Sequence, residues 1–358
     1  MPGRDIVCIG ASAGGINALI DFLGALPEVP AALFVVVHTS PQGGGLLAEV
    51  LSRAGSWRTS YARDGEAIEH GRIYVAPADH HLLVKRNQVR TVRGPRENRF
   101  RPAIDPLFRT ASHAYGARVI GIVLSGGLDD GTHGLELIKR HGGIAIAQDP
   151  EEAISPSMPL SAIQNVEVDY ILRSAAIAAR LPQLVAHQVD EAEPVALARQ
   201  EYHDVAEGIE DIREQLTGPP SEFTCPECGG TLWELGGGRV LRYRCHVGHG
   251  YTAESLLADQ GDGLENALWG ALRALEEHSM LRRRMADHAL STGNDPVARN
   301  FEDEAKQTEL RASTIRQLLQ VERSGSPERR HAEAADMGRK AKRLVEPRPG
   351  TRSRKTNR

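Results

Sequence analysis

A serine flanked by small residues lies between an apolar run and a helix-like stretch near the start of the sequence. Residues 10–15 read Gly-Ala-Ser-Ala-Gly-Gly, so Ser12 occupies the centre of a G-x-S-x-G pattern. In a strand–turn–helix setting this pattern is typical of a nucleophilic serine, because small neighbours allow a sharp turn and the helix N-terminus offers N–H groups to an oxyanion. Glycines in such a turn also bind dinucleotide phosphates, so the pattern alone leaves a hydrolase and a nucleotide binder open.

Residues that follow two other apolar runs favour the hydrolase. His38 directly follows the run at 33–37, and two adjacent acids, Asp129 and Asp130, follow a later Val- and Ile-rich run. The carboxyl ends of parallel strands meet at one edge of a sheet, where ligands bind. A nucleophilic serine needs a general base, and the base needs a carboxylate to orient it. The sequence therefore predicts a Ser-His-Asp triad with Ser12 and His38, and either acid could supply the carboxylate.

Other residues could in principle take part in this chemistry. The alternative bases are His80, His81, His113 and His133, but none directly follows a buried apolar run, so we expect structural or substrate-edge roles for them. Cys8 lies inside the first apolar run, where a buried apolar role is expected rather than a nucleophile.

The elements that must position the triad alternate between strands and helices over residues 1–186. The expected strands are 6–9, 33–37, 72–75, 119–124, 144–147 and 168–171. The expected helices are 16–26, 46–53, 104–115 and 132–141, and 82–85 with 88–92 could form a β-hairpin. Short buried strands alternating with helices predict an α/β fold, a doubly wound and mostly parallel sheet covered on both faces.

These motifs, in this order, resemble the catalytic domain of the bacterial chemotaxis protein-glutamate methylesterases, the CheB family. The resemblance covers about residues 4–186, and the segments that carry it are 10–15, His38, 73–81, 98–105 and 124–131. It implies a Rossmann-like methylesterase fold, with Ser12 as nucleophile, His38 as general base and Asp130, rather than Asp129, as orienting carboxylate. The implied reaction is hydrolysis of a glutamyl methyl ester on a chemoreceptor, without a catalytic cofactor; family members also deamidate receptor glutamines.

Two features depart from the family pattern. The methionine that the family often has ahead of its aspartate, where it takes part in oxyanion stabilisation, is replaced by Gly127, so only a backbone N–H could act there. Family members also usually begin with a phosphoacceptor receiver domain, whereas this sequence begins at the catalytic strand. We therefore expect no regulation by phosphorylation in cis.

A second constellation combines three cysteines with a histidine. Cys225 and Cys228 form a C-x-x-C turn that ends in glycines, and Cys245 follows after sixteen intervening residues, with His246 and His249 close behind. Three thiolates and one imidazole fit a structural, tetrahedral Zn²⁺ with no open position. We expect His249 to be the fourth ligand, because His246 adjoins Cys245 and adjacent side chains tend to diverge. A redox C-x-x-C is the alternative, which the third cysteine disfavours. The segment also resembles the C-terminal ribbons of standalone methylesterases.

Composition divides the rest of the chain. We expect a methylesterase domain at 1–186, an acidic helical linker at 187–220, a zinc ribbon at 221–255, a helical hairpin at 262–322 and a basic, disordered tail at 323–358.

Residues 329–358 hold eleven Lys or Arg against three Asp or Glu, a net charge of +8 that leaves −12 for the remainder. An acidic folded part repels phosphates, so nucleic-acid binding is not expected as the main function. No run is long enough to span a membrane and no secretory signal is present, which predicts a cytoplasmic protein.

The leading hypothesis is a serine hydrolase that demethylates a chemoreceptor or a similar signalling protein. A non-catalytic scaffold that binds a partner through the ribbon, hairpin and tail is the alternative. A nucleotide-binding oxidoreductase is weaker, because no acid is placed to bind a ribose. Since the ribbon and triad lie far apart in sequence, we expect turnover of a small ester to survive zinc removal. The sequence makes no prediction of oligomeric state.

Overall fold

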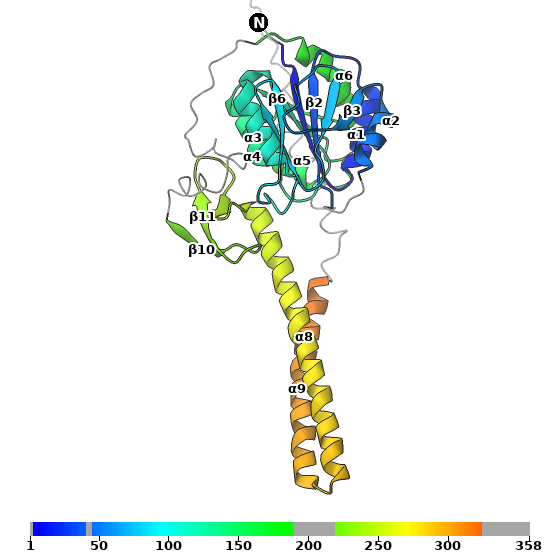
Figure 1. Ribbon diagram of the computed structural model, residues 1–358, viewed down its shortest axis with the longest axis vertical. Helices are drawn as coiled ribbons and strands as arrows, with labels where there is room; N and C mark the ends of the chain where they lie inside the picture. The colour runs from blue at the N-terminus through cyan, green and yellow to red at the C-terminus, as the bar shows by residue number, and fades with distance from the viewer. Residues whose placement is uncertain (1–2, 41–44, 190–218, 324–358) are drawn as a thin grey trace, which may run out of the picture. The chain divides into compact units, whose positions relative to one another are not determined.

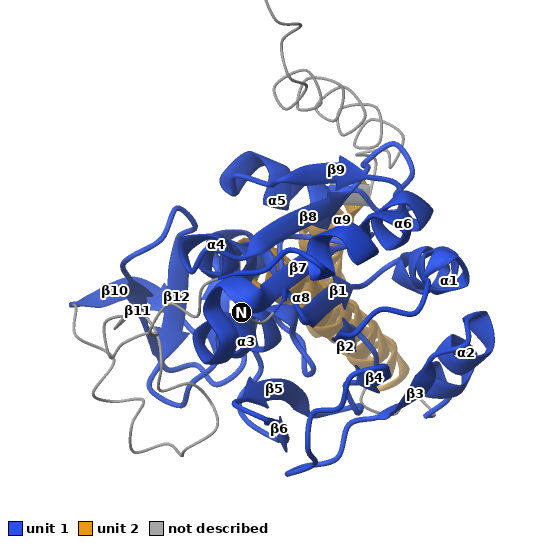
Figure 2. Ribbon diagram, turned by 90° about the horizontal axis from the view of Figure 1, so that it is seen from above, with its two compact units in different colours: residues 1–256, 333–358 blue, residues 257–332 orange. Residues whose placement is uncertain are grey.

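The computed structural model describes residues 3–40, 45–189 and 219–323. The chain divides into two compact units, residues 1–256 with 333–358 and residues 257–332 (Figure 2). Most of the expected acidic linker and basic tail lies outside the described residues. Within the described ranges, no helix is both long and apolar enough to cross a membrane.

A parallel sheet of seven strands forms the centre of the first unit (Figure 1). Its strand order is β3-β4-β2-β1-β7-β8-β9, and every neighbouring pair is parallel. The strands are β1 (Ile6–Ala11), β2 (Ala32–Val37), β3 (Arg58–Tyr61), β4 (Arg72–Val75), β7 (Val119–Val123), β8 (Ile144–Gln148) and β9 (Tyr170–Leu172). The expected doubly wound, mostly parallel sheet is confirmed.

Helices cover both faces of this sheet, because its central strands are apolar on both sides. Val7 and Ile9 of β1 pack into one core cluster, while Ile6 and Cys8 pack into the other. The first cluster lies under α1 (Gly15–Ala25), α2 (Leu47–Ala54) and α6 (Ser174–Val185). The second lies under α3 (Ile104–Tyr115), α4 (Thr132–Arg140) and α5 (Ser157–Asn165), and a short 3-10 turn, η1 (Gly116–Arg118), joins α3 to β7. An antiparallel hairpin of β5 (His81–Lys85) and β6 (Gln88–Val92) packs on the α3 side.

A small antiparallel sheet completes the first unit. Its four strands are β10 (Pro220–Thr224), β11 (Thr231–Leu235), β12 (Arg242–Cys245) and β13 (Gly250–Thr252). Their buried residues form a separate core of six side chains, which are Cys225, Leu232, Tyr243, Cys245, Tyr251 and Leu256. We call residues 220–256, which comprise this sheet and the first turn of the following helix, the Cys/His module.

Two long helices, α8 (Ala253–Ser291) and α9 (Asp295–Arg323), account for the described part of the second unit. Leu272 packs with Ala312 and Leu319, and Ser279 Oγ donates to the Ala305 carbonyl at 3.2 Å. The helix α8 begins at Ala253, whereas the sequence predicts a helical hairpin that begins at residue 262. A reciprocal cap causes the earlier start, because the Thr252 N–H donates to Ser255 Oγ at 2.9 Å and the Ser255 N–H donates to Thr252 Oγ1 at 3.1 Å.

Candidate active site

The central strand and its two neighbours bring three polar side chains to one edge of the sheet. β1 pairs with β2 on one side and with β7 on the other. The strand order therefore extends from β1 toward one edge of the sheet through β2 and toward the other edge through β7. Ser12 follows β1, His38 follows β2, and Asp130 lies in the loop after β7. Open α/β sheets bind ligands beyond the carboxyl ends of their strands at such a switch point.

Hydrogen bonds connect these three side chains in series. His38 Nδ1 lies 3.1 Å from Ser12 Oγ, and His38 Nε2 lies 2.7 Å from Asp130 Oδ2. The side chains of His38 and Asp130 are only 3% and 2% exposed. The Phe100 ring stacks on the imidazole with centroids 3.7 Å apart and planes 9° apart, which fixes the orientation of the ring. The arrangement leaves Nδ1 facing the serine and Nε2 facing the carboxylate.

Asp130 is held in its charged form by a ring of donors. Burial opposes ionisation, but hydrogen bonds from His38, the Ile104 N–H at 2.7 Å and the Asn98 amide at 2.8 Å hold the pKa of Asp130 below its usual range. The same Asn98 amide donates its second hydrogen to Asp105 Oδ2 at 2.9 Å. Burial, and then the neighbouring charge of Asp130, raise the pKa of Asp105. The two carboxyls that share one amide are therefore driven toward opposite charge states.

The adjacent acid, Asp129, points elsewhere. Its Oδ1 accepts the Thr252 hydroxyl at 2.7 Å. Burial raises the pKa of Asp129 to about 7, and the hydrogen bond from Thr252 opposes that rise. Asp130, rather than Asp129, is the acid that contacts His38.

The other candidate histidines contact groups other than Ser12. His80 Nδ1 contacts the Ala78 carbonyl at 3.0 Å, and the buried His81 contacts the Pro95 carbonyl at 2.8 Å. His113 lies edge-on to His141, and His133 is fully buried on α4. Burial lowers the pKa of His113 to about 4, with a contribution from His141, and burial lowers that of His133 to about 3. Cys8 is also fully buried in β1, and burial raises the pKa of its thiol.

Glycines let the loop after β7 pack directly against Ser12. The Ser12 N–H donates to the Ser125 carbonyl at 2.9 Å. A Cβ on Gly126 would lie 2.0 Å from the Met158 sulfur and 2.9 Å from Ser12 Cβ, so a side chain there would displace the serine. Gly14, at φ 73°, turns the chain from Ser12 into α1.

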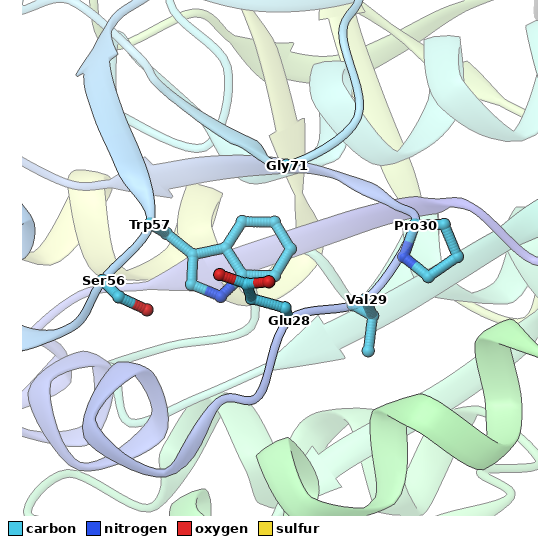
Figure 3. Close-up of a pocket in the computed structure, with 6 residues that line it drawn as sticks. All are labelled: Glu28, Val29, Pro30, Ser56, Trp57 and Gly71. Atoms are coloured by element: carbon cyan, nitrogen blue, oxygen red, sulfur yellow. The ribbon is translucent and has the colours of Figure 1, made fainter.

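An apolar cavity of about 440 Å³ lies at the carboxyl ends of β2, β3 and β4, and its lining includes Thr39, the residue after His38. Its lining residues are uncharged and come from α1, α2 and the ends of β2, β3 and β4; they are Ile16, Thr39, Gly45, Leu46, Leu47, Val50, Tyr61, Ala76, Pro77 and Ala78. A second cavity, of about 380 Å³, is lined by Glu28, Val29, Pro30, Ser56, Trp57 and Gly71 (Figure 3). Those residues precede β2, β3 and β4, so the second cavity lies at the amino ends of the strands, away from Ser12.

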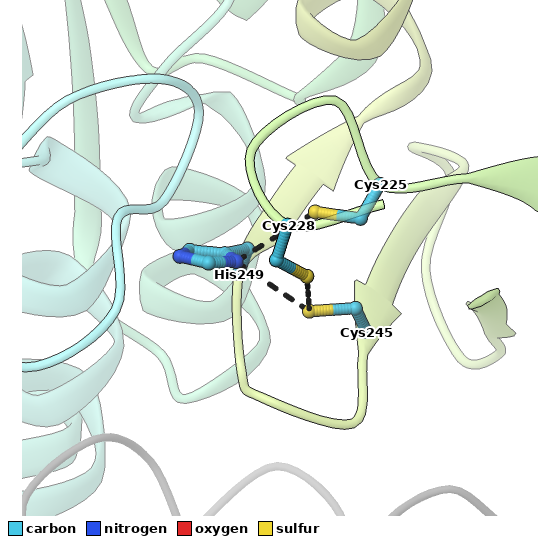
Figure 4. A group of neighbouring side chains, drawn as sticks. All are labelled: Cys225, Cys228, Cys245 and His249. Carbon is cyan, nitrogen blue, oxygen red and sulfur yellow. Dashed lines mark hydrogen bonds between the residues drawn. The ribbon is translucent and has the colours of Figure 1, made fainter. Parts of the chain in front are cut away.

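The four predicted metal ligands also lie together, with their ligand atoms all within 4.8 Å of one another (Figure 4). Cys228 Sγ is 3.7 Å from Cys245 Sγ, and His249 Nδ1 is 3.6 Å from the sulfurs of both Cys225 and Cys245. Metal–sulfur bonds of about 2.3 Å and metal–nitrogen bonds of about 2.0 Å in a tetrahedron give edges of roughly 3.5–3.8 Å. The donor set and these three distances fit a bound metal ion.

Sequence reasoning missed two side chains of the site. Asn98 and Phe100 lie in a segment that carries the family resemblance, but nothing in their types or spacing assigned them to Asp130 or to His38. The sequence signal available was an asparagine and an aromatic residue just ahead of α3, whose first residue, Ile104, donates its N–H to Asp130.

Comparisons with known proteins show which chains this one is similar to. The family profile described as CheB methylesterase matches residues 7–181. A Leptospira interrogans protein, provisionally named protein-glutamate methylesterase/protein-glutamine glutaminase, is 39% identical over 176 residues, which cover 49% of this chain and 91% of the relative. A Methanosarcina mazei protein-glutamate methylesterase/protein-glutamine glutaminase is 36% identical over 47% of this chain and 48% of its own length, so the match spans about half of that relative. The crystal structure of the Thermotoga maritima CheB methylesterase catalytic domain matches with 34% identity and a TM-score of 0.49, over 52% of this chain and all of that one.

Proposed function

The chain belongs to the CheB methylesterase family, and on that premise we propose that it hydrolyses glutamyl methyl esters, and deamidates glutamines, on a chemoreceptor or a related signalling protein. The observation that carries the proposal is the series of hydrogen bonds from Ser12 through His38 to Asp130 at the switch point of the sheet. We assign Ser12 as nucleophile, His38 as general base and Asp130 as orienting carboxylate. A scaffold without catalysis does not require this arrangement.

In the first half of the reaction, Ser12 Oγ attacks the ester carbonyl carbon. Its proton passes to His38 Nδ1, 3.1 Å away, while the Nε2–H remains donated to Asp130. The ionised carboxylate fixes this tautomer and stabilises the imidazolium that forms. The imidazolium then protonates the departing methoxide, so methanol leaves and a glutamyl ester of Ser12 remains.

In the second half, a water molecule attacks the acyl-enzyme. His38 Nδ1 takes the proton of the water, and the tetrahedral intermediate collapses to release glutamate and to return the proton to Ser12 Oγ. With a glutamine substrate the leaving group is ammonia and the same steps apply. We assign the oxyanion donors to the backbone N–H of Ala13, which follows the nucleophile, and to that of Gly127.

The uncharged lining of the cavity at the carboxyl ends of β2, β3 and β4, the same edge of the sheet as Ser12, supports this substrate class. The ester and the amide are neutral, whereas the product carboxylate is charged and loses hydration against an apolar wall. The cavity therefore favours substrate over product, which helps release.

The test follows methanol release from a methyl-labelled receptor together with labelling of Ser12 by a fluorophosphonate. Ser12→Ala should abolish both, because it removes the attacking oxygen while Ala fits the same turn. Ser56→Ala, the same change at the opposite edge of the sheet, should leave both unchanged. Full turnover by Ser12→Ala would exclude Ser12 as nucleophile.

We further propose that Cys225, Cys228, Cys245 and His249 hold one Zn²⁺. Thiolates and imidazole are soft ligands that suit zinc, and four protein ligands leave no position for substrate. When bound, the ion would order the Cys/His module; no step of the hydrolysis uses it.

A further inference from the structure

The Cys/His module contacts the loop that carries Asn98 and Phe100. The Asn98 N–H donates to the Gly250 carbonyl of β13 at 2.8 Å, and the Gly250 N–H donates to the Arg96 carbonyl at 3.1 Å. Glu97, in the same loop, is 5% exposed and lies 2.9 Å from Arg109 of α3 and 3.2 Å from Arg244 of β12. The loop therefore lies between the α/β domain and the module and is bonded to both.

The side chain of Asn98 extends this connection to the triad. Its amide nitrogen donates to Asp130 and to Asp105, while its oxygen accepts the Ser255 hydroxyl at 3.2 Å and the Thr252 N–H at 2.9 Å, an N–H that is shared with Ser255 Oγ. An asparagine side chain has two N–H donors and one oxygen with two lone pairs. All four positions are used, and the partners on the oxygen belong to the module.

The backbone of this loop needs support from outside. Asn98 and Arg99 are consecutive residues with φ of 49° and 76°, in the left-handed region that residues other than glycine rarely adopt. Such conformations persist where surrounding contacts over-determine them. Here those contacts are the backbone pairing with Gly250 and the ion pairs of Glu97. Phe100, one residue further along, is the ring that stacks on His38.

We propose that the Cys/His module is a positioning element of the active site, in which Ser255 and Thr252 hold Asn98 so that its amide fixes the carboxylate of Asp130. Asn98 is then a positioning residue for the triad, and Ser255 acts through it. The proposal rests on the proposed hydrolase function. It also replaces the expectation that turnover of a small ester is independent of the module. Asn98 and Thr252 are 154 residues apart in the sequence, yet a hydrogen bond of 2.9 Å joins them.

The test uses the full chain and a small activated ester. Ser255→Ala removes one of the two bonds to the Asn98 oxygen and the bond that the Thr252 N–H donates to Ser255 Oγ. We therefore expect kcat to fall about tenfold with KM little changed, since displacement of a catalytic group by a fraction of an ångström slows the chemical step. Fluorophosphonate labelling of Ser12 should slow by the same factor. Ser221→Ala is the matched control, because it removes a hydroxyl of β10 that donates within the module to the Leu232 carbonyl at 2.8 Å, whereas Ser255 lies in the first turn of α8. It should leave kcat unchanged.

A double-mutant cycle separates positioning from general loss of structure. Asn98→Ala should lower kcat at least as much as Ser255→Ala, and adding Ser255→Ala to Asn98→Ala should produce no further loss. Hydrogen exchange at the amides of residues 97–100 should accelerate in Ser255→Ala, whereas exchange in β1 and β7 should not.

The possible outcomes are distinct. The positioning role would be overturned by a normal kcat in Ser255→Ala, or by independent, multiplicative losses of kcat in the double variant. Labelling of Ser12 in the wild-type protein would still uphold the hydrolase function in either case. An equal loss in Ser221→Ala would also overturn it, because the effect would then come from destabilising the module. Absence of Ser12 labelling in the wild-type protein would instead overturn the proposed function itself.

Discussion

The pKa values of two neighbouring acids in one loop are shifted in opposite directions by what surrounds them. Asp130 faces His38, Asn98 and three backbone N–H groups, and the hydrogen bonds from His38, Ile104 and Asn98 hold its pKa low against burial. Asp129 is buried with one hydroxyl donor, and burial raises its pKa to about 7. The type of residue is the same at both positions, so the difference in role comes from the donors supplied by the fold.

Amide substitutions at the two acids are expected to differ strongly in their effect on turnover. Asp130→Asn should lower kcat by ~10⁴, because the amide no longer fixes the catalytic tautomer of His38 or stabilises its imidazolium. Asp129→Asn should change kcat little, since this side chain does not touch His38. Steady-state kinetics on a small ester compares them directly. A severe loss in Asp129→Asn with a mild one in Asp130→Asn would reverse the assignment.

The raised pKa of Asp129 should make the stability of the protein depend on pH. Its pKa in the folded protein, about 7, lies above the ordinary value of 3.8, so the folded state holds a proton that the unfolded state releases. This contribution to stability is complete below pH ~4 and is lost as the pH rises through 7. Asp129→Asn mimics the protonated acid and should raise the free energy of unfolding by more than about 1 kcal/mol at pH 8, with little effect at pH 4. Urea unfolding at both pH values measures the difference, and equal changes at the two pH values would contradict the assignment.

At the scale of elements, sequence patterns predict the strands that are buried on both faces. β1, β2 and β7 are continuous apolar runs, so the pattern alone places the residues that follow them, Ser12, His38 and Asp130, at one edge of the sheet. β3 has the sequence Arg-Thr-Ser-Tyr at the edge of the sheet and carries no such signal. The helices α5 and α6, Ser157–Asn165 and Ser174–Val185, are also not among the helices that the sequence predicts.

The partners of the triad could not be predicted for a different reason. Asn98 reaches Asp130 across 32 residues and Thr252 across 154, and a pattern within one element contains no information on such pairings. The start of α8 at Ala253 could not be predicted from the sequence pattern either. The cap formed by Thr252 and Ser255 is followed by glycines at 261 and 263, which interrupt the helical pattern.

The helix α2 forms one wall of the apolar cavity, and we expect it to contact the protein substrate. Val50→Asp places a charge in that wall and should raise KM for a methylated receptor by about tenfold, the effect of losing one apolar contact, while kcat on a small ester is unchanged. Ser52→Asp is the matched control, because Ser52 is an exposed residue of the same helix outside the cavity lining. Equal KM values for the two variants would place the substrate elsewhere.

At the scale of the first unit, a buried ion pair joins the module to the α/β domain. Glu97 contacts Arg109 and Arg244, and all three side chains are 5% exposed. Glu97→Gln leaves two buried guanidinium groups without this carboxylate and should lower the free energy of unfolding by about 3 kcal/mol or more. Glu227→Gln makes the same change at the exposed pair with Arg96 and should cost less than about 1 kcal/mol. Denaturant unfolding measures both, and similar losses would mean that burial does not govern this interface.

Metal removal tests how far the two parts of this unit depend on each other. The α/β domain has two large core clusters, whereas the module has six buried core residues, of which Cys225 and Cys245 are candidate ligands. A core this small does not offset the entropy of ordering the chain, so binding of Zn²⁺ and folding of the module should be coupled.

We expect one zinc per chain by elemental analysis of protein purified without chelators. Chelation should then abolish hydrogen-exchange protection in residues 221–252 while β1 and β7 remain protected. Labelling of Ser12 should slow as the support of Asn98 is lost, and added zinc should restore it. Protein that contains no zinc yet keeps protection in residues 221–252 would show that the four ligands order the module without a metal. Loss of protection in β1 together with the module would instead show that the α/β domain cannot hold its fold without that support.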